Sequence, residues 1–270
     1  MRIFMPSFYA HYRFGCDVLD ILPLDIQTIC RENRVLFDIG LHGPDIFFFH
    51  TPLIPNPISK YGHALHGANG SELLIQAKNV IKAASDKEAS LAYWYGFLCH
   101  LALDSSCHPG VYKAQTYTGA GHTAIETALD HMLLTMDGIV PQQHDPCGHF
   151  QITPYNAAVI SPFFPPVNAR TVEKSLHSMV TYGHLLYIRH PIARKALDLA
   201  LYITGHHESL SGMLMTHTED TRCKKSNRAL FKLYKEAVPL AAELIEKSSL
   251  YIESNVPPDS VFDRTFKGSL

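Results

Sequence analysis

The chain has 270 residues, 46% of them hydrophobic, so it can bury a substantial core as one large domain or two modest ones. Its net charge of −2, with histidines counted as neutral, gives no indication of a nucleic-acid or membrane partner held by bulk charge. Histidine is abundant, with 17 residues against 14 phenylalanines, and 11 of the 17 fall within the first 149 positions. Polar chemistry is therefore expected in the amino-terminal half.

The six cysteines and the start of the chain bear on its location. The cysteines form no C-x-x-C pair, which disfavours a zinc ribbon and a small disulfide scaffold, so we interpret them as reduced thiols. Pro6, His11 and Arg13 interrupt any apolar stretch at the start, and no small-residue cleavage site follows. No run of about 18 to 20 apolar residues occurs that could form a transmembrane helix. We expect a cytoplasmic protein.

Helical periodicity dominates the chain from its first residues. The first helix is predicted over residues 8–22, with His11 in its first turn. Residues 43–59 contain four prolines and are expected to be irregular, with Asp45 in this loop. Apolar residues then recur at helical spacing over 71–84.

The next helix is predicted from Ser85 to about Ser105. Ser85 and Glu88 have the spacing of a capping box, which would satisfy two backbone donors at the helix start. Apolar residues surround most of this helix, which predicts that it is buried. His100 and Asp104 share one of its faces.

Two further signals mark the end of this region. His108 precedes Pro109, which disfavours helical backbone, so His108 is expected on an extended turn just past the helix end. A glycine-containing turn follows, and the next helix carries His122 and Glu126 on one face until Gly138 ends it.

The remaining chain is expected to be a proline-rich irregular segment followed by helices. Residues 141–168 are the candidate for a lid or a loop facing the substrate. Three helices follow, over about 172–189, 191–205 and 227–248, the last with a kink at Pro239. We predict a single all-α domain over 1–270, with a metal-site core over about 1–140 and carboxy-terminal helices over about 170–250.

Paired histidines and carboxylates carry the chemistry. When these residues are four apart on a helix they lie one above the other, which lets both hold one divalent metal ion. His100 with Asp104 and His122 with Glu126 have this spacing, and His108 lies between them. One such pair alone would more simply be a structural hydrogen bond. Several such groups buried together carry a large desolvation cost that a shared cation offsets, so the whole set predicts a multi-metal site.

Together these motifs resemble the zinc-dependent phospholipase C family, whose relatives include the S1/P1-type nucleases. That family has a helical H-x-x-x-D, a following histidine and then H-x-x-x-E, as in residues 100–126. Upstream it has a histidine opening the first helix, an aspartate and a second histidine, and His11 and Asp45 resemble the first two. The third is His63 or His66, of which we favour His63. The resemblance implies an all-α multi-helix bundle of the phospholipase C and P1 nuclease type.

The resemblance also implies ligands for two zinc ions and a third. One ion would be held by Asp45, His63, His100 and Asp104. A second would be held by His108, His122 and Glu126. A third would involve His11 and a bridging Asp104. In secreted members the third ion also takes the amine of an N-terminal tryptophan, whereas this chain starts at Met1, which could offer its own amine, and has its single tryptophan at position 94.

The activity implied is zinc-dependent hydrolysis of a phosphate ester. Metal ions about 3.5 to 4 Å apart activate a water molecule and clamp the attacking and leaving oxygens. Asp45 is the candidate general base or water-orienting group. Imidazole and carboxylate ligands together suit Zn²⁺ best, without excluding Mn²⁺ or Fe²⁺. The substrate would be a lipid or small-molecule phosphate ester, and phospholipid, nucleotide and other esters all stay open.

Two alternatives remain. The first is another metal-dependent phosphohydrolase or a nuclease. A phosphohydrolase of the HD type needs an adjacent His-Asp pair on a helix, but His144-Asp145 lies between Pro141 and Pro146 and is poorly placed. The second is a non-catalytic helical scaffold that binds metal for stability. Open coordination positions would distinguish an enzyme from such a scaffold.

Overall fold

The computed structural model describes residues 7–52, 54–188, 190–205, 207–254 and 256–269. The all-α prediction is confirmed, and within these residues the strands are limited to a small hairpin of β1 (Arg264–Thr265) and β2 (Gly268–Ser269). The helices are α1 (Phe8–Leu19), α2 (Leu24–Glu32), α3 (Arg34–Gly40), α4 (Pro57–Leu65), α5 (Gly70–Ala83), α6 (Lys87–Thr118), α7 (His122–Met136), α8 (Pro154–Ile160), α9 (Ala169–Leu186), α10 (Pro191–Ile203), α11 (His207–Leu210) and α12 (Lys224–Glu253).

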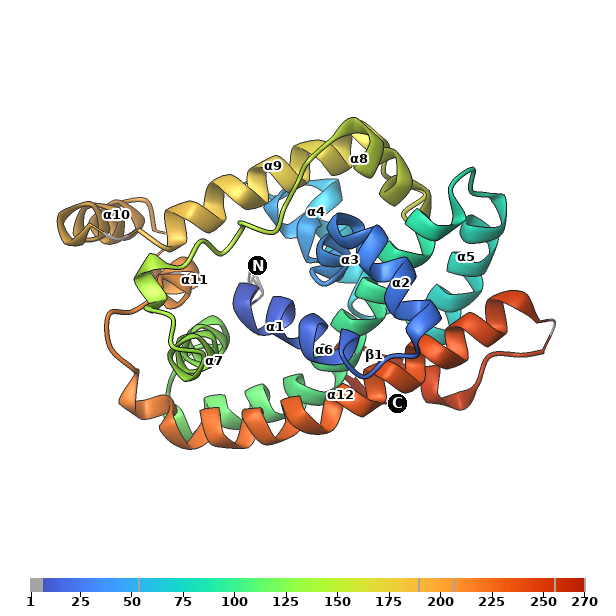
Figure 1. The fold of residues 1–270 in the computed structure, drawn as a ribbon. Coiled ribbons are helices and arrows are strands. Elements are labelled where there is room, and N and C mark those ends of the chain that lie inside the picture. The colour runs from blue at the N-terminus through green and yellow to red at the C-terminus, as the bar shows by residue number, and fades with distance from the viewer. Residues whose placement is uncertain (1–6, 53, 189, 206, 255, 270) are drawn as a thin grey trace.

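Helix α6 is the central element, and α12 packs along it (Figure 1). Residues 92–105 of α6 are all buried, as its apolar circumference predicted. The helix begins one residue later than the predicted capping box, because the Asp86 side chain accepts a hydrogen bond from the Ala89 N–H at 3.0 Å. Gly119, with φ of +65°, ends it.

The prediction that this helix ends near Ser105 is wrong. Pro109 lies inside α6, and His108 is helical rather than on an extended turn. A proline inside a helix costs about 3 kcal/mol, but burial of Val111 and Ala114 in the next turns favours continuation of the helix. Tertiary packing has therefore overridden the local rule, and all three residues of the H-x-x-x-D-x-x-x-H series lie on one helix.

Helices α3 and α6 cross with their backbones in contact. A Cβ atom on Gly96 would lie 2.1 Å from the carbonyl oxygen of Phe37, and one on Gly40 would lie 2.3 Å from that of Tyr93. Only glycine fits at such a crossing. The close approach brings the Leu41 carbonyl, at the end of α3, within reach of His100.

The two segments expected to be irregular contain short helices. Residues 43–59 include the 3₁₀ helix η1 (Gly43–Phe49) and the start of α4, which Asn56 caps by accepting from the Ser59 N–H at 2.9 Å. The segment 141–168 contains α8 and the 3₁₀ turns η2 (Pro141–Gln143) and η3 (Ser161–Phe163). The first predicted helix ends at Leu19 rather than at residue 22, and α2 and α3 were not predicted.

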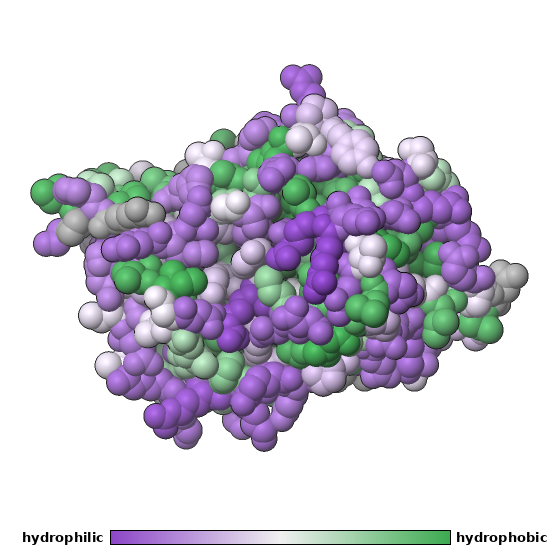
Figure 2. All heavy atoms as spheres, viewed as in Figure 1, coloured by the Kyte–Doolittle hydropathy of each residue, from purple (hydrophilic) through white to green (hydrophobic). Residues whose placement is uncertain are grey.

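At the α10 end, hydrophobic residues lie at the surface (Figure 2), among them Ile192 and Ile203, each more than 70% exposed. In the described part of the chain, no helix combines the length and the apolar character needed to cross a membrane.

Candidate metal centre

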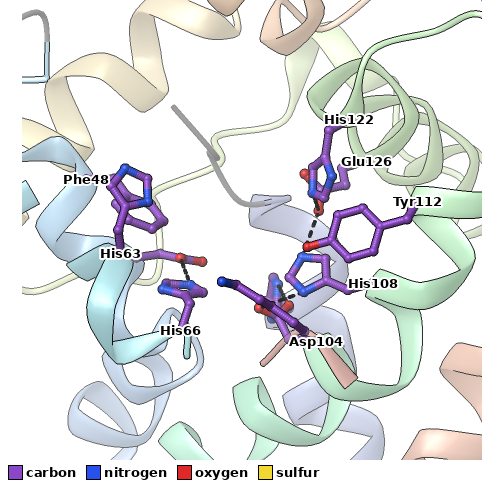
Figure 3. A pocket seen from close by; sticks show the side chains of 11 residues that line it. Phe48, His63, His66, Asp104, His108, Tyr112, His122 and Glu126 are labelled. Atoms are coloured by element: carbon purple, nitrogen blue, oxygen red, sulfur yellow. Dashed lines mark hydrogen bonds and ion pairs between the residues drawn. The ribbon is translucent and has the colours of Figure 1, made fainter. Parts of the chain in front are cut away.

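Three groups of histidine and carboxylate side chains meet at one cavity, which α1, η1, α4, α6, α7 and the β1–β2 turn all help to line. Figure 3 shows Phe48, His63 and His66 on one side and Tyr112, His122 and Glu126 on the other, with Asp104 and His108 between them. Within each group the candidate ligand atoms lie within 4.8 Å of one another. These residues come from distant parts of the chain, so the cluster is a product of the tertiary fold.

The first group is Asp45, His66 and His100, all buried. The two oxygens of Asp45 lie 2.8 Å from His66 Nε2 and 3.4 Å from His100 Nε2. The structure places His66 in this group, whereas the sequence interpretation favoured His63. Both rings pack on Phe48, with centroids 4.9 Å apart for His66 and 4.5 Å apart for His63. His63 lines the cavity but does not join this group, and Asp104, expected among these ligands, belongs to the next one.

The second group is His11, His100 and Asp104. The oxygens of Asp104 lie 3.4 Å from His11 Nε2 and 3.3 Å from His100 Nε2, and the two imidazoles stack with centroids 4.4 Å apart. This is the predicted pairing of His11 with Asp104, with His100 added. The amine of Met1, considered as a further ligand here, lies outside the described residues.

The third group is His108, His122 and Glu126, the set predicted from sequence. Glu126 Oε1 lies 3.0 Å from His122 Nε2 and 3.5 Å from His108 Nε2. His108 Nδ1 is 3.7 Å from Asp104, so the third group adjoins the second. The three groups therefore form one continuous cluster.

Backbone carbonyls orient three of these imidazoles. His100 Nδ1 donates to the Leu41 carbonyl at 3.0 Å, His66 Nδ1 donates to the Gly62 carbonyl at 2.7 Å, and His108 Nδ1 donates to the Phe266 carbonyl. A carbonyl can only accept, so the hydrogen of each neutral ring is on Nδ1 and the lone pair is on Nε2. For these three rings, Nε2 is the atom turned toward the carboxylates.

The ionisation of the cluster is strongly coupled. Burial alone would raise the pKa of Asp104, but the imidazoles of His108 and His100 outweigh it and hold that pKa well below its usual range. Burial disfavours the charged form of His108, whereas the nearby Asp104 carboxylate favours it. The net effect raises the pKa of His108 to about 10. Burial, assisted by the charge of His100, lowers the pKa of His11 to about 4. Without a bound metal ion, protonated imidazoles thus balance the negative charges of the buried carboxylates.

Unsatisfied atoms in the cluster fit a bound cation. His100 Nε2 and Glu126 Oε2 are buried, and neither has a hydrogen-bond partner among the described residues. Such atoms are costly unless they meet a donor, a proton or a metal ion. Three ligands from each group would leave open coordination positions, and the imidazole and carboxylate donors suit Zn²⁺. The residues present therefore fit the ion that the resemblance implies.

Asp130 supports the cluster, although the sequence analysis did not single it out. It lies four residues after Glu126, on the same face of α7, and its buried carboxylate accepts from the backbone N–H groups of Tyr9 at 3.1 Å and Ala10 at 2.7 Å. It thereby caps the start of α1, directly before His11. Its position four residues after Glu126 was the sequence feature that could have indicated a role for Asp130 near the cluster.

The alternative His144-Asp145 dipeptide lies away from the cluster, in the segment after η2. Asp145 pairs with His184 at 2.9 Å, and both side chains are about half exposed. This arrangement gives the HD-type interpretation no support.

Comparison with known families agrees with the geometry. The family described as zinc dependent phospholipase C matches residues 10–168, more than half of the chain, and this range includes every residue of the three groups. No curated protein and no solved structure matches the chain. On the family match, this chain belongs to the zinc-dependent phospholipase C family.

Proposed function

We propose that this protein is a zinc-dependent phosphoesterase that hydrolyses a lipid or small-molecule phosphate ester. The observation that carries the proposal is the continuity of the three groups beside a cavity. The first and second groups share His100, and the third adjoins the second through His108 and Asp104. A purely structural ion would need one closed site, whereas each group here supplies three candidate ligands. We propose two zinc ions, with a third at His11 and Asp104.

Bound divalent ions would supply Lewis acidity and a water of lowered pKa at the cluster. The protein's own contribution is to hold the donors rigidly, through the carbonyl contacts of His66, His100 and His108. Asp45 stands at the cavity wall with both oxygens directed at the imidazoles of His66 and His100. We assign it the role of orienting the attacking water and accepting its proton.

Metal analysis combined with hydrolysis assays tests the proposal. The purified protein should contain at least two equivalents of zinc and cleave a chromogenic phosphomonoester or phosphodiester, with activity lost on chelation and restored by zinc. Bound zinc with every ester left intact would favour the non-catalytic scaffold instead. Cleavage of nucleic acid in the same assay would favour the nuclease alternative.

Asp45→Asn separates catalysis from folding. This variant keeps the size of the side chain and one oxygen, so we expect its thermal stability to stay close to that of the unmodified protein. Loss of a general base should lower kcat by about 100- to 10,000-fold. Equal loss of stability and activity would contradict the assignment of Asp45.

A further inference from the structure

The β1–β2 hairpin brings Lys267 to the cavity and packs Phe266 against His66 and His100. The hairpin lies about a hundred residues beyond the segment that matches the family. We propose that Lys267 binds a phosphate oxygen of the substrate, so that the hairpin completes the binding site. This inference rests on the proposed phosphoesterase function. It concerns this chain's own residues, since the family match ends at residue 168.

The hairpin is fixed firmly enough to position a side chain. The Phe266 ring is fully buried, with centroids 5.1 Å from His66 and 5.4 Å from His100, and its carbonyl accepts from His108 Nδ1. One residue thus contacts ligands from all three groups. The Lys267 N–H donates to the Thr265 hydroxyl at 3.2 Å, which holds the turn itself.

Lys267 carries a positive charge that is available to bind an anion. Of the described residues that line the cavity, it is the only lysine or arginine. No carboxylate of the described chain lies within 4.0 Å of its ammonium group in an ion pair, although Asp45, Asp104 and Glu126 line the same cavity. Those three carboxylates face the imidazoles instead.

The chemistry favours phosphate over other partners for this ammonium. If bound cations neutralised the three carboxylates, an anionic phosphate ester at the cluster would be attracted to the nearby ammonium group. Lysine is a compact point charge and a common phosphate binder. The alternative is that Lys267 stabilises the neighbouring carboxylates when no metal is bound. In that case substitution of Lys267 should change the zinc content rather than the phosphate affinity.

The test measures binding of inorganic phosphate to the full-length, zinc-loaded protein by calorimetry, together with ester hydrolysis and zinc content. Lys267→Met should weaken phosphate binding about tenfold, the loss expected for one hydrogen bond to a charged group. It should raise KM more than it lowers kcat and leave zinc content unchanged, and Lys267→Arg should restore most of the affinity. The matched control is Lys60→Met, an exposed lysine of α4 that does not line the cavity.

The outcomes separate this inference from the proposed function. Ester hydrolysis with equal phosphate affinity in the original protein and Lys267→Met overturns the role of Lys267 and leaves the phosphoesterase intact. Phosphate binding that depends on Lys267, without hydrolysis of any ester, supports the anion site and contradicts the enzyme. A fall in zinc content in Lys267→Met, or no phosphate binding by the zinc-loaded protein, also overturns the inference.

Discussion

Helices α6 and α10 are both rich in apolar residues, yet they lie at opposite extremes of burial. Residues 92–105 of α6 are all buried, whereas none of the described side chains of α10 is. α10 is attached partly through Arg194, which donates to the carbonyls of Leu214, at 3.2 Å, and Met215. Buried carboxylates and imidazoles need surroundings that cannot relax, and the packing around α6 provides them for His100, Asp104 and His108. The difference predicts where substitutions matter.

The largest effect is expected for Asp104→Ala on α6. The change leaves His11, His100 and His108 without their common carboxylate. Breaking such a buried network costs about 3 to 5 kcal/mol of the free energy of unfolding, and zinc should be lost with it. Denaturant unfolding and zinc analysis check this, with Asp198→Ala on α10, an exposed partner of His207, as the control. Full zinc content in Asp104→Ala would contradict the assignment of Asp104 as a metal ligand.

Asp130 on α7 should give a smaller, pH-dependent effect. Burial raises its pKa from an ordinary 3.8 to about 6, although the hydrogen bonds of the α1 cap act in the opposite direction. The folded protein thus binds this proton more tightly than the unfolded chain, so the contribution of Asp130 to stability falls as pH rises from about 4 to about 6. The full change is about 3 kcal/mol.

The measurement is the difference in free energy of unfolding between the unmodified protein and Asp130→Asn across this pH range. Asp198→Asn on α10 is the control. A difference for Asp130→Asn that stays constant or grows with pH would show that the sign is wrong.

His66 and His63 provide the next comparison, within the centre itself. We expect His66→Ala to weaken zinc binding in the first group at least about 100-fold, since even residues behind the ligands cost 10- to 100-fold. His63→Ala, which removes a ring outside the three groups, should retain zinc. Competition with a chelator measures both. Equal zinc affinities in the two variants would remove the distinction that the geometry draws.

The smallest effect is expected on α10. Ile203 is 74% exposed, so Ile203→Ser should change the free energy of unfolding by less than about 0.5 kcal/mol and leave ester hydrolysis unchanged. Thermal unfolding and the hydrolysis assay check this. A large loss of stability would mean that α10 packs more tightly than its exposure indicates.

The sequence could predict elements whose signals are local. Helix α7 begins and ends near its flanking glycines, and the four-residue spacing placed His122 and Glu126 3.0 Å apart. The continuation of α6 through Pro109 could not be predicted, because it depends on packing that a local rule does not include.

Long-range contacts were also beyond the sequence. His63 and His66 stand three residues apart on one short segment, and it is the fold, which brings His66 Nε2 to 2.8 Å from Asp45, that places His66 in the first group. The Phe266 carbonyl that orients His108 comes from 158 residues away and is a backbone group, which carries no residue-type signal. The position of Lys267 at the cavity likewise depends on long-range packing, which a sequence pattern does not reveal.

The glycine crossing of α3 and α6 should limit how fast metal ions can leave the cluster. Amide hydrogens of α6 beneath Gly40 and Gly96 are shielded by direct backbone contact, so they should exchange with deuterium only when the whole domain unfolds. The α6 ligands would then be the last to move. A chelator would have to extract the ions through fluctuations of η1, α4 or α7, and the release rate should follow the local opening of those segments.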